Sequence, residues 1–331
     1  MKEHTNLSSN FTLIDKPNQI LEIAGTLHIY ALPVLIAFGI PSNLLSLVVF
    51  TCSTAMNKLP SSTYMAALAL SDSGFLSILL CIWLQQMKIQ EYVTQLWCQV
   101  IVFGAYIFGF LSVWFTVLFT IERYKVICYP LKATQICSKR RARLSTLIIC
   151  IIAMFLYFSS FWTTINHQGE CTFREELFIL LTIITYVDTI ITFLIPFLAI
   201  VFMNIRIIFA VRALKKRINW LQESQPHEKI QNLLSKTQMK LTKSLVIVSS
   251  VFLMLVLPSH FTRFYFLIFT HFLSSDLKLT LQTAQYILQF PYYLTFGINF
   301  LLYTCTSYMF RQGLLEIYRN IKEKVRSIKF K

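Results

Sequence analysis

Seven long apolar segments divide the chain. They cover residues 25–52, 61–87, 96–128, 144–163, 178–205, 244–270 and 281–305, and polar or charged sequence bounds each of them. An α-helix rises about 1.5 Å per residue and needs about 20 apolar residues to cross the hydrocarbon core of a bilayer. Each segment meets this length, so the pattern predicts an all-α membrane protein with seven membrane-spanning helices.

Composition and charge support this prediction and orient the chain. The 331 residues are 56% hydrophobic and 14% charged, whereas about 25% of the residues of soluble domains are charged. If the N-terminus is extracellular, 24 of the 30 Lys and Arg residues lie on the inner side. The positive-inside rule favours this orientation. The net charge of +15 then belongs to a cytoplasmic surface that attracts anionic membrane lipids, and no nucleic-acid partner is expected.

The predicted spans divide the chain into three parts. Residues 1–24 form a polar extracellular tail in which Asn6 and Asn10 begin two glycosylation sequons. Residues 25–306 form the seven-transmembrane domain. Residues 307–331 carry basic and apolar residues at helical spacing, which predicts an amphipathic helix on the inner membrane surface followed by a basic tail.

The third apolar segment has a distinctive group at each end. Cys98 lies near its outer end, and Glu122-Arg123-Tyr124 closes its inner end. Such a segment resembles the third helix of rhodopsin-class G-protein-coupled receptors. The other segments carry matching motifs in the same order, over about residues 25–320: Asn43, Asp72 in Leu68-Ala69-Leu70-Ser71-Asp72, Pro196, Pro258, and Asn299 with Tyr303. The resemblance implies a plasma-membrane receptor that passes agonist binding outside to a heterotrimeric G protein inside.

The resemblance implies a disulfide and a switch. It pairs Cys98 with Cys171, which would fix the loop between the fourth and fifth spans to the third; the other cysteines fall in spans or on the inner side, where disulfides are not expected. At the inner end, the Arg of the triplet leaves its acid when a G protein docks. The residues assigned to this switch are Glu122, Arg123, Tyr124, Pro258, Asn299 and Tyr303.

A polar cluster is expected inside the membrane. A carboxylate near the bilayer centre costs about 2.5–3.5 kcal/mol on insertion scales, so Asp72 should face the bundle interior and have partners. The resemblance implies a cluster of Asn43, Asp72, Ser112 and Asn299 that can hold a sodium ion at Asp72. The alternative is that Asn43 and Asp72 are hydrogen-bonded packing residues only. No other metal and no organic cofactor is expected.

Several positions depart from the family pattern. Val256 stands where a Trp is usual before Pro258, Asn204 replaces a common Tyr, the fourth span lacks its mid-helix Trp, and Phe300 replaces the Pro after Asn299. Receptors for small neuropeptides, including the FMRFamide-like group, have a similar Asn-Phe-x-x-Tyr ending. The missing Trp leaves open a constitutively active, weakly coupled or chemosensory receptor of the same fold.

Charged and polar residues in the outer halves of the spans indicate the ligand. Ala105 replaces the Asp that amine receptors use, and residues 281–305 lack the Lys of opsins. An intramembrane charge marks a functional site by default, and a peptide suits a pocket with one acid, one base, amides and phenols. The predicted ligand residues are Asp188, Arg263, His260, Gln99, Tyr106, Gln285, Gln289 and Tyr292.

Three alternatives are open. Asp188 and Arg263 could pair with each other rather than face a ligand, because buried charges usually find partners, and His260 could be a satisfied core residue. A seven-span transporter or channel is a different class, but it should show internal repeats or broken helices, and the chain has only eight glycines and no evident repeat. The sequence has no nucleophile constellation, metal-ligand spacing or phosphate loop, so no enzymatic activity is expected.

Overall fold

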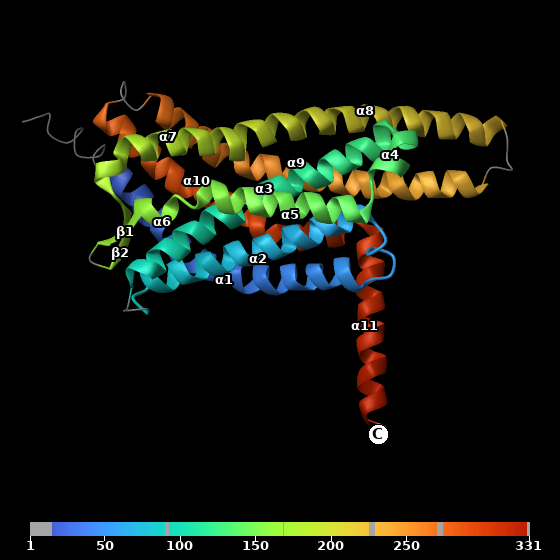
Figure 1. Cartoon of the computed structure of the whole chain (residues 1–331), viewed down its shortest axis with the longest axis horizontal. Helices are drawn as coiled ribbons and strands as arrows, with labels where there is room; N and C mark the ends of the chain where they lie inside the picture. The colour runs from blue at the N-terminus through green and yellow to red at the C-terminus, as the bar shows by residue number, and fades with distance from the viewer. Residues whose placement is uncertain (1–14, 90–92, 168, 225–228, 270–273, 330–331) are drawn as a thin grey trace, which may run out of the picture.

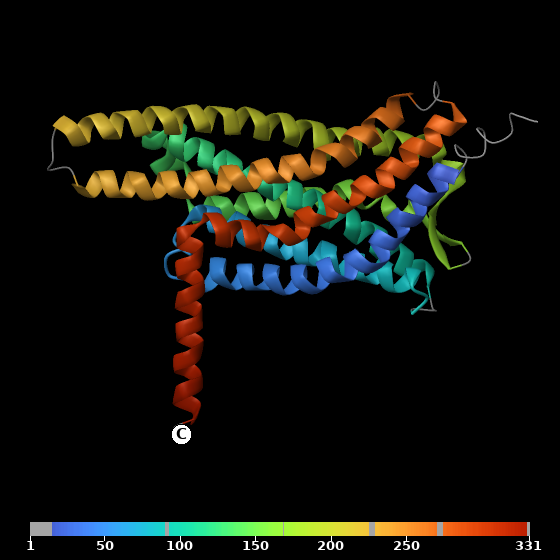
Figure 2. The same ribbon diagram turned by 180° about the vertical axis from the view of Figure 1, so that it is seen from behind.

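A bundle of long helices forms the body of the protein. The computed structural model describes residues 15–89, 93–167, 169–224, 229–269 and 274–329. Within these residues seven rods lie side by side, and one further helix, α11, leaves the bundle at one end (Figures 1 and 2). The predicted all-α fold with a helix after the seventh span is confirmed. The glycosylation sites Asn6 and Asn10 lie outside the described residues.

The elements follow one another in a simple order. They are α1 (Asp15–Cys52), α2 (Pro60–Gln86), α3 (Gln95–Cys128), α4 (Pro130–Ile136), α5 (Lys139–Tyr157), α6 (Ser160–Thr163), β1 (Thr164–His167), β2 (Glu170–Phe173), η1 (Glu175–Leu177), α7 (Phe178–Thr189), η2 (Ile190–Leu194), α8 (Ile195–Ser224), α9 (Lys229–Phe269), α10 (Ser275–Thr306) and α11 (Tyr308–Lys329). The fifth rod consists of α7, η2 and α8 in sequence. We call the end that carries the β-strands the outer end and the end that carries α11 the inner end.

Six of the rods in the described part of the chain are long and apolar enough to cross a membrane. The seventh, α10, is more polar because it carries Gln285, Gln289, Tyr292 and Asn299. These side chains are at least partly buried. They therefore face the neighbouring helices rather than lipid. Large apolar side chains such as Val34, Phe155 and Phe261 are exposed on the outside of the bundle, as expected for a surface in contact with hydrocarbon.

Aromatic packing fills the interior in layers. Phe75 of α2 stacks on Phe296 of α10, with ring centroids 3.8 Å apart, and this pair belongs to a cluster towards the outer end. Towards the inner end, Phe50 packs edge-on against Tyr303 with centroids 5.2 Å apart. Gly39 and Gly297 lie at the contact between α1 and α10, and a Cβ would lie 2.5 Å from Leu76 Cδ1 at the first position and 2.6 Å from Leu35 Cδ1 at the second.

A hairpin and a disulfide cover the outer end. Strands β1 and β2 pair antiparallel, with His167 opposite Glu170, and Gly169 adopts a φ of +87°, which favours glycine. Cys171 of β2 is bonded to Cys98 of α3, with Cα atoms 5.2 Å apart. The predicted bridge between the two outer cysteines is therefore confirmed, and it fixes the hairpin over α3.

The fifth rod contains a turn of π-helix. In η2 the backbone N–H of Ile195 donates to the carbonyl of Ile190, five residues earlier. Pro196 follows at once, and proline has no N–H with which to continue the α-helical ladder. A π-turn holds one more residue than an α-turn. The outer half of this rod, α7, is therefore rotated about the helix axis relative to α8.

Helix α11 runs away from the bundle at a steep angle to it (Figure 1). Its contacts to the bundle lie in its first half. A Cβ on Gly313 would lie 3.0 Å from Val49 and Ser53, so glycine permits the close approach to α1. Glu316 accepts hydrogen bonds from the Ser53 hydroxyl at 2.9 Å and the Thr54 backbone N–H at 3.2 Å. Beyond this point Tyr318, Ile321 and Val325 are exposed.

Candidate functional site: a cavity at the outer end

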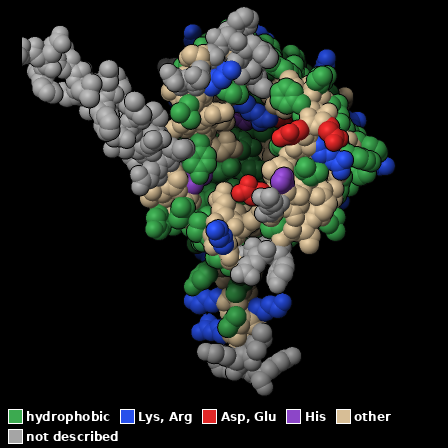
Figure 3. Space-filling view, turned by 90° about the vertical axis from the view of Figure 1, so that its left-hand side faces the viewer, with side chains coloured by type: hydrophobic (Ala, Val, Ile, Leu, Met, Phe, Trp, Pro, Cys, Tyr) green, Lys and Arg blue, Asp and Glu red, His purple; other side chains and the backbone are tan. Residues whose placement is uncertain are grey.

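A cavity opens at the outer end of the bundle. It encloses about 320 Å³ and is lined by residues of α2, α3, α5, α9 and α10, of the fifth rod and of β2. Figure 3 looks onto this end and shows the hollow in the middle of the molecule. Its volume lies at the lower end of the range for small-molecule and cofactor sites. The hairpin contributes Phe173 to the lining, so the disulfide holds one part of the cavity in place.

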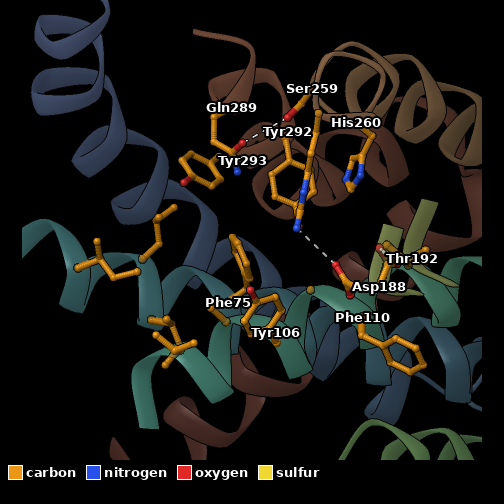
Figure 4. Close-up of a pocket in the computed structure, with 18 of the residues that line it drawn as sticks. Phe75, Tyr106, Phe110, Asp188, Thr192, Ser259, His260, Gln289, Tyr292 and Tyr293 are labelled. Atoms are coloured by element: carbon orange, nitrogen blue, oxygen red, sulfur yellow. Dashed lines mark hydrogen bonds and ion pairs between the residues drawn. The ribbon is translucent and has the colours of Figure 1, made fainter. Parts of the chain in front are cut away.

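Asp188 is the buried acid of the cavity. Tyr157 of α5 donates a 2.6 Å hydrogen bond to its Oδ1, and the Arg263 guanidinium lies 3.8 Å from its Oδ2. Figure 4 shows Asp188 in the wall of the cavity, with a dashed line that marks this ion pair. The second distance exceeds the 2.7–2.9 Å of a charge-assisted hydrogen bond. Arg263 has 34% of its side chain exposed. The acid is therefore firmly bound to Tyr157, whereas the base keeps most of its donor capacity.

A group of side-chain hydroxyl and amide donors and acceptors lies between α9 and α10. The Gln285 amide donates to the Ser259 hydroxyl at 3.0 Å, and that hydroxyl donates to Gln289 Oε1 at 3.2 Å. The buried Gln285 Oε1 has no hydrogen-bond partner among the described residues. Because an unpaired buried acceptor costs free energy, this oxygen is suited to accept a bond from a molecule in the cavity.

Aromatic rings form much of the rest of the wall. His260 stacks on Phe193, with centroids 5.1 Å apart, and meets the edge of Tyr292. Tyr106 stacks on Tyr157 with centroids 5.3 Å apart, so it supports the ring that holds Asp188. The His260 Nδ1 atom is buried and has no partner within the described part of the chain. The histidine therefore has a packing role and also one unused polar atom.

The structure brings together seven of the eight predicted ligand residues. Those that line the cavity are Tyr106, Asp188, His260, Arg263, Gln285, Gln289 and Tyr292. Gln99 does not line it, because its amide donates to the backbone carbonyl of Phe161 at 2.7 Å. Asp188 and Arg263 do pair, as the alternative assumed, but at 3.8 Å.

Some residues of the cavity wall were not predicted from the sequence. Tyr157 binds Asp188, and Ser259 joins the two glutamines. Thr192 lines the cavity while its hydroxyl donates to the backbone carbonyl of Asp188 at 2.7 Å. Tyr157 and Ser259 are polar residues in the outer halves of apolar spans, and this signal could have identified them.

A second group of polar residues lies deeper in the bundle. Asp72 is fully buried; its Oδ1 accepts a bond from Ser112 at 2.6 Å, and its Oδ2 accepts one from Asn299 at 2.7 Å. Asn43 does not bond to Asp72, since its amide donates to the backbone carbonyl of Phe296 at 2.6 Å. The structure thus joins three of the four predicted members directly and places the fourth against α10.

The donor set is compatible with a cation. Carboxylate, hydroxyl and amide oxygens are ligands for hard cations, and Asp72, Ser112 and Asn43 supply one of each kind. The buried Asn43 Oδ1 has no hydrogen-bond partner in the described structure. These oxygens could hold a sodium ion, which would neutralise the carboxylate.

The inner end of the bundle is closed. Arg123 is 2% exposed; its guanidinium bonds to Glu122 at 2.9 Å and to the Ser61 hydroxyl. Asn204 of α8 donates to the Ser249 hydroxyl of α9 at 2.9 Å, so the residue that replaces the common Tyr joins two helices. Val256 is buried in an apolar cluster with Phe193 and Phe252.

The seventh rod ends in an aromatic contact with α11. Phe300, which replaces the usual Pro, packs edge-on against Phe310 with centroids 5.8 Å apart. The Tyr303 ring also contacts Phe310, while its buried hydroxyl has no hydrogen-bond partner in the described residues. Asn299, Tyr303 and Phe300 therefore connect the polar cluster above to the base of α11.

A membrane bundle with a cavity at one end and a buried Glu-Arg pair at the other defines a seven-helix receptor. The sequence pattern described as "7 transmembrane receptor (rhodopsin family)" matches residues 42–303, so the chain belongs to the rhodopsin family of seven-transmembrane receptors. It is also similar to the growth hormone secretagogue receptor type 1 of Sus scrofa, at 25% identity over 301 residues that cover 86% of this chain and 78% of that protein. Members of the family are receptors, so the prediction of no enzymatic activity is confirmed. The transporter alternative is wrong.

Proposed function

We propose that the chain is a plasma-membrane receptor for a small neuropeptide, and that agonist binding in the outer cavity lets a heterotrimeric G protein dock at the inner end. The observation that carries this proposal is the loose ion pair between Asp188 and Arg263 in a cavity that also contains amides and phenols. Peptides present carboxylate, amide and basic groups that match these partners. The similarity to a secretagogue receptor supports a ligand of hormone type.

The two charges would have unequal roles. Asp188 is buried and already accepts a 2.6 Å bond from Tyr157, whereas Arg263 is partly exposed and has only a long contact to the acid. A carboxylate or carbonyl of the ligand would therefore meet Arg263 first. A basic ligand group would then replace Arg263 beside Asp188, which keeps the acid paired and avoids an uncompensated buried charge.

The route to the inner end would pass through the bundle core. Tyr292 of α10 lines the cavity and packs edge-on against Phe75 and Phe296. The Phe296 carbonyl binds Asn43, and Asn299 binds Asp72. A ligand that moves α10 would thus disturb the polar cluster, with its proposed sodium ion, and below it the contacts of Tyr303. Glycosylation at Asn6 and Asn10, with the N-terminus outside, completes the proposal.

A screen of amidated neuropeptides on cells that express the chain tests this function. The readout is dissociation of the G-protein subunits, and expression at the cell surface is measured in parallel. An active peptide should lose potency on Arg263→Gln and retain it on Lys278→Gln, which removes a charge at the outer end without altering the cavity lining. G-protein dissociation that is high without peptide and unchanged by every peptide would instead indicate a constitutively active receptor.

A further inference from the structure

A second cavity lies at the inner end, on the outside of the bundle. It encloses about 680 Å³ between α3, α4 and α8. The residues that line it are Ile121, Tyr124, Lys125, Tyr129, Lys132, Ala133, Ile136, Ala199, Phe202 and Met203. It lies on a different part of the molecule from the outer cavity, and the proposed function makes no use of it. We refer to it below as the α4 groove.

The α4 groove opens outwards rather than into the core. Phe202 is 57% exposed and Tyr129 is 47% exposed, although both are large and aromatic. On the same side of α8, Leu198, Ile205 and Phe209 are also exposed. Such a row of apolar side chains faces hydrocarbon in a membrane protein. The groove is therefore open to the acyl chains of the surrounding lipid.

The walls formed by α3 and α8 both change from apolar to basic residues towards the inner end. On α8 the groove passes from Ala199 to Phe202, and Arg206 follows one turn later on the same face and lines the adjoining depression with Cys128. On α3 it passes from Ile121 to Lys125. Both helices run from the outer to the inner end, so the apolar part lies deep in the membrane and the cations lie at its inner boundary.

The α4 helix adds a cation at that boundary. Lys132 is exposed and lines the groove beside Tyr129. Among the described residues that line the groove, none is acidic; the nearby Glu122 is buried and bonded to Arg123. The positive charges of Lys125, Lys132 and Arg206 are therefore not neutralised from within the groove.

We propose that the α4 groove is a binding site for an anionic phospholipid of the inner leaflet. One acyl chain lies against Ala199, Phe202 and Met203, and the headgroup meets Lys125, Lys132 and Arg206. An amphiphile with a negative head matches the groove at both ends, whereas a zwitterionic lipid matches only the apolar end. Because Tyr124 lines the groove and adjoins Arg123, the lipid occupies the space beside the switch.

Lipid binding to the purified full chain tests the proposal. Native mass spectrometry in detergent counts bound palmitoyl-oleoyl phosphatidylserine and, as a matched probe, phosphatidylcholine with the same chains. Each basic residue beside an anionic headgroup contributes about fivefold in affinity, so phosphatidylserine should bind at least about tenfold more tightly. Equal affinity for the two lipids, or equal binding of phosphoserine without acyl chains, would overturn the proposal.

Charge variants locate the site. The triple variant Lys125→Gln, Lys132→Gln and Arg206→Gln should reduce phosphatidylserine affinity to the level of phosphatidylcholine. If this variant does not fold, Lys132→Gln alone, at an exposed position of a short helix, should lower the affinity about fivefold. An unchanged affinity in whichever of these variants folds would contradict the assignment.

Two controls separate this groove from the basic inner surface in general. The variant Lys58→Gln, Arg143→Gln and Lys243→Gln removes three exposed charges of the same sign elsewhere at the inner end and should preserve the preference for phosphatidylserine. Filling the groove with Ala199→Phe should weaken binding of both lipids, whereas Ala37→Phe on the exposed face of α1 should not. If the control triple variant lowered phosphatidylserine affinity as much as the groove variant, or if Ala37→Phe weakened binding as much as Ala199→Phe, the lipid would not be bound at a defined site.

Discussion

Tyr157 of α5 and Asp188 of α7 are joined by a 2.6 Å hydrogen bond in the wall of the outer cavity. Both residues are buried, and the bond links two helices that belong to different spans. A hydrogen bond to a charged group contributes about 1.5–3 kcal/mol. The pair therefore fixes the position of the carboxylate before any ligand arrives.

Removal of the Tyr157 hydroxyl tests this relationship. Tyr157→Phe leaves Asp188 with one long contact to Arg263, so we expect the free energy of unfolding to fall by about 1–3 kcal/mol. Thermal unfolding of the solubilised receptor measures the change. Tyr30→Phe, at a largely exposed position of α1, is the control. If the two variants unfold at the same temperature, the bond does not contribute to stability.

A charge exchange distinguishes a ligand site from a structural ion pair. If Asp188 and Arg263 both face a peptide, each single substitution should lower agonist potency at an unchanged surface level. Breaking a desolvated charged contact on one side costs about 2–5 kcal/mol, or tens to thousands of fold in affinity. The double variant Asp188→Arg with Arg263→Asp should then remain impaired towards the native peptide. Full recovery of potency by this exchange would assign the pair to structure alone.

The polar cluster predicts a dependence on sodium. Asp72→Asn keeps the shape of the side chain but removes the charge that would attract the cation. We expect any effect of sodium on agonist affinity to disappear in this variant, as measured by binding across a sodium series with choline as the balancing cation. Ser46→Ala, at a buried serine that bonds to the carbonyl of Ser42 within its own helix, should keep the effect. An unaltered sodium response in Asp72→Asn would leave the cluster a packing feature.

The link between α8 and α9 predicts a change in basal signalling. Asn204 and Ser249 bond at 2.9 Å, and this bond must break if the two helices separate at the inner end. Asn204→Leu keeps a similar volume and removes the bond, whose net contribution is about 0.5–1.5 kcal/mol. We expect G-protein dissociation without agonist to rise by up to about tenfold. Ser250→Ala, where the contact is 3.5 Å, should leave the basal level unchanged.

The attachment of α11 should depend on pH. Hydrogen bonds from Ser53 and from both the side chain and backbone of Thr54 lower the pKa of Glu316 below its ordinary value. The folded pKa is the lower one, so this contribution to attachment is complete above the unfolded pKa of about 4.3 and is lost as the pH falls through the folded value. Glu316→Gln should abolish the pH dependence.

Spin labels measure that attachment. Labels at Lys58→Cys and Glu323→Cys, with Cys52 and Cys305 replaced by Ser, report the separation between α1 and α11. In the native background the distance distribution should broaden on acidification below about pH 4.3, and in Glu316→Gln it should be the same at all pH values. A distribution that broadens equally in both proteins would show that another group controls the helix.

The sequence predicted the bundle well because hydropathy averages over a whole span. Seven apolar segments sufficed for the fold, although α10 with its Gln and Tyr residues is less apolar than the others. Individual contacts depend instead on the rotation of each helix. Gln99 was expected in the cavity but bonds to the Phe161 carbonyl of α6, because the rotation of α3 turns its side chain towards the end of the fourth span, and hydropathy does not specify that rotation. Tyr157 was missed since its partner lies on another span.

The resemblance to the receptor family was a better guide to contacts between residues far apart in the sequence. Asp72, Ser112 and Asn299 meet as predicted, and Cys98 and Cys171 form their bridge. The π-turn at η2 could not be predicted, because its five residues, Ile190–Leu194, are mostly apolar and fit an α-helix equally well. Only the missing N–H of Pro196 indicated an irregularity nearby.

Because of the extra residue in η2, the two halves of the fifth rod, α7 and α8, are rotated differently about the helix axis. An α-helix turns about 100° per residue, so a regular α-helix over the same residues would swing Asp188 by about that angle, away from Tyr157, while Phe202 and Arg206 kept their heading. The π-turn of Ile190–Leu194 therefore sets the angle between the cavity face of this rod and the face that borders the α4 groove. Loss of the π-turn with no change in the number of residues would separate the acid from Tyr157 and leave the groove in place.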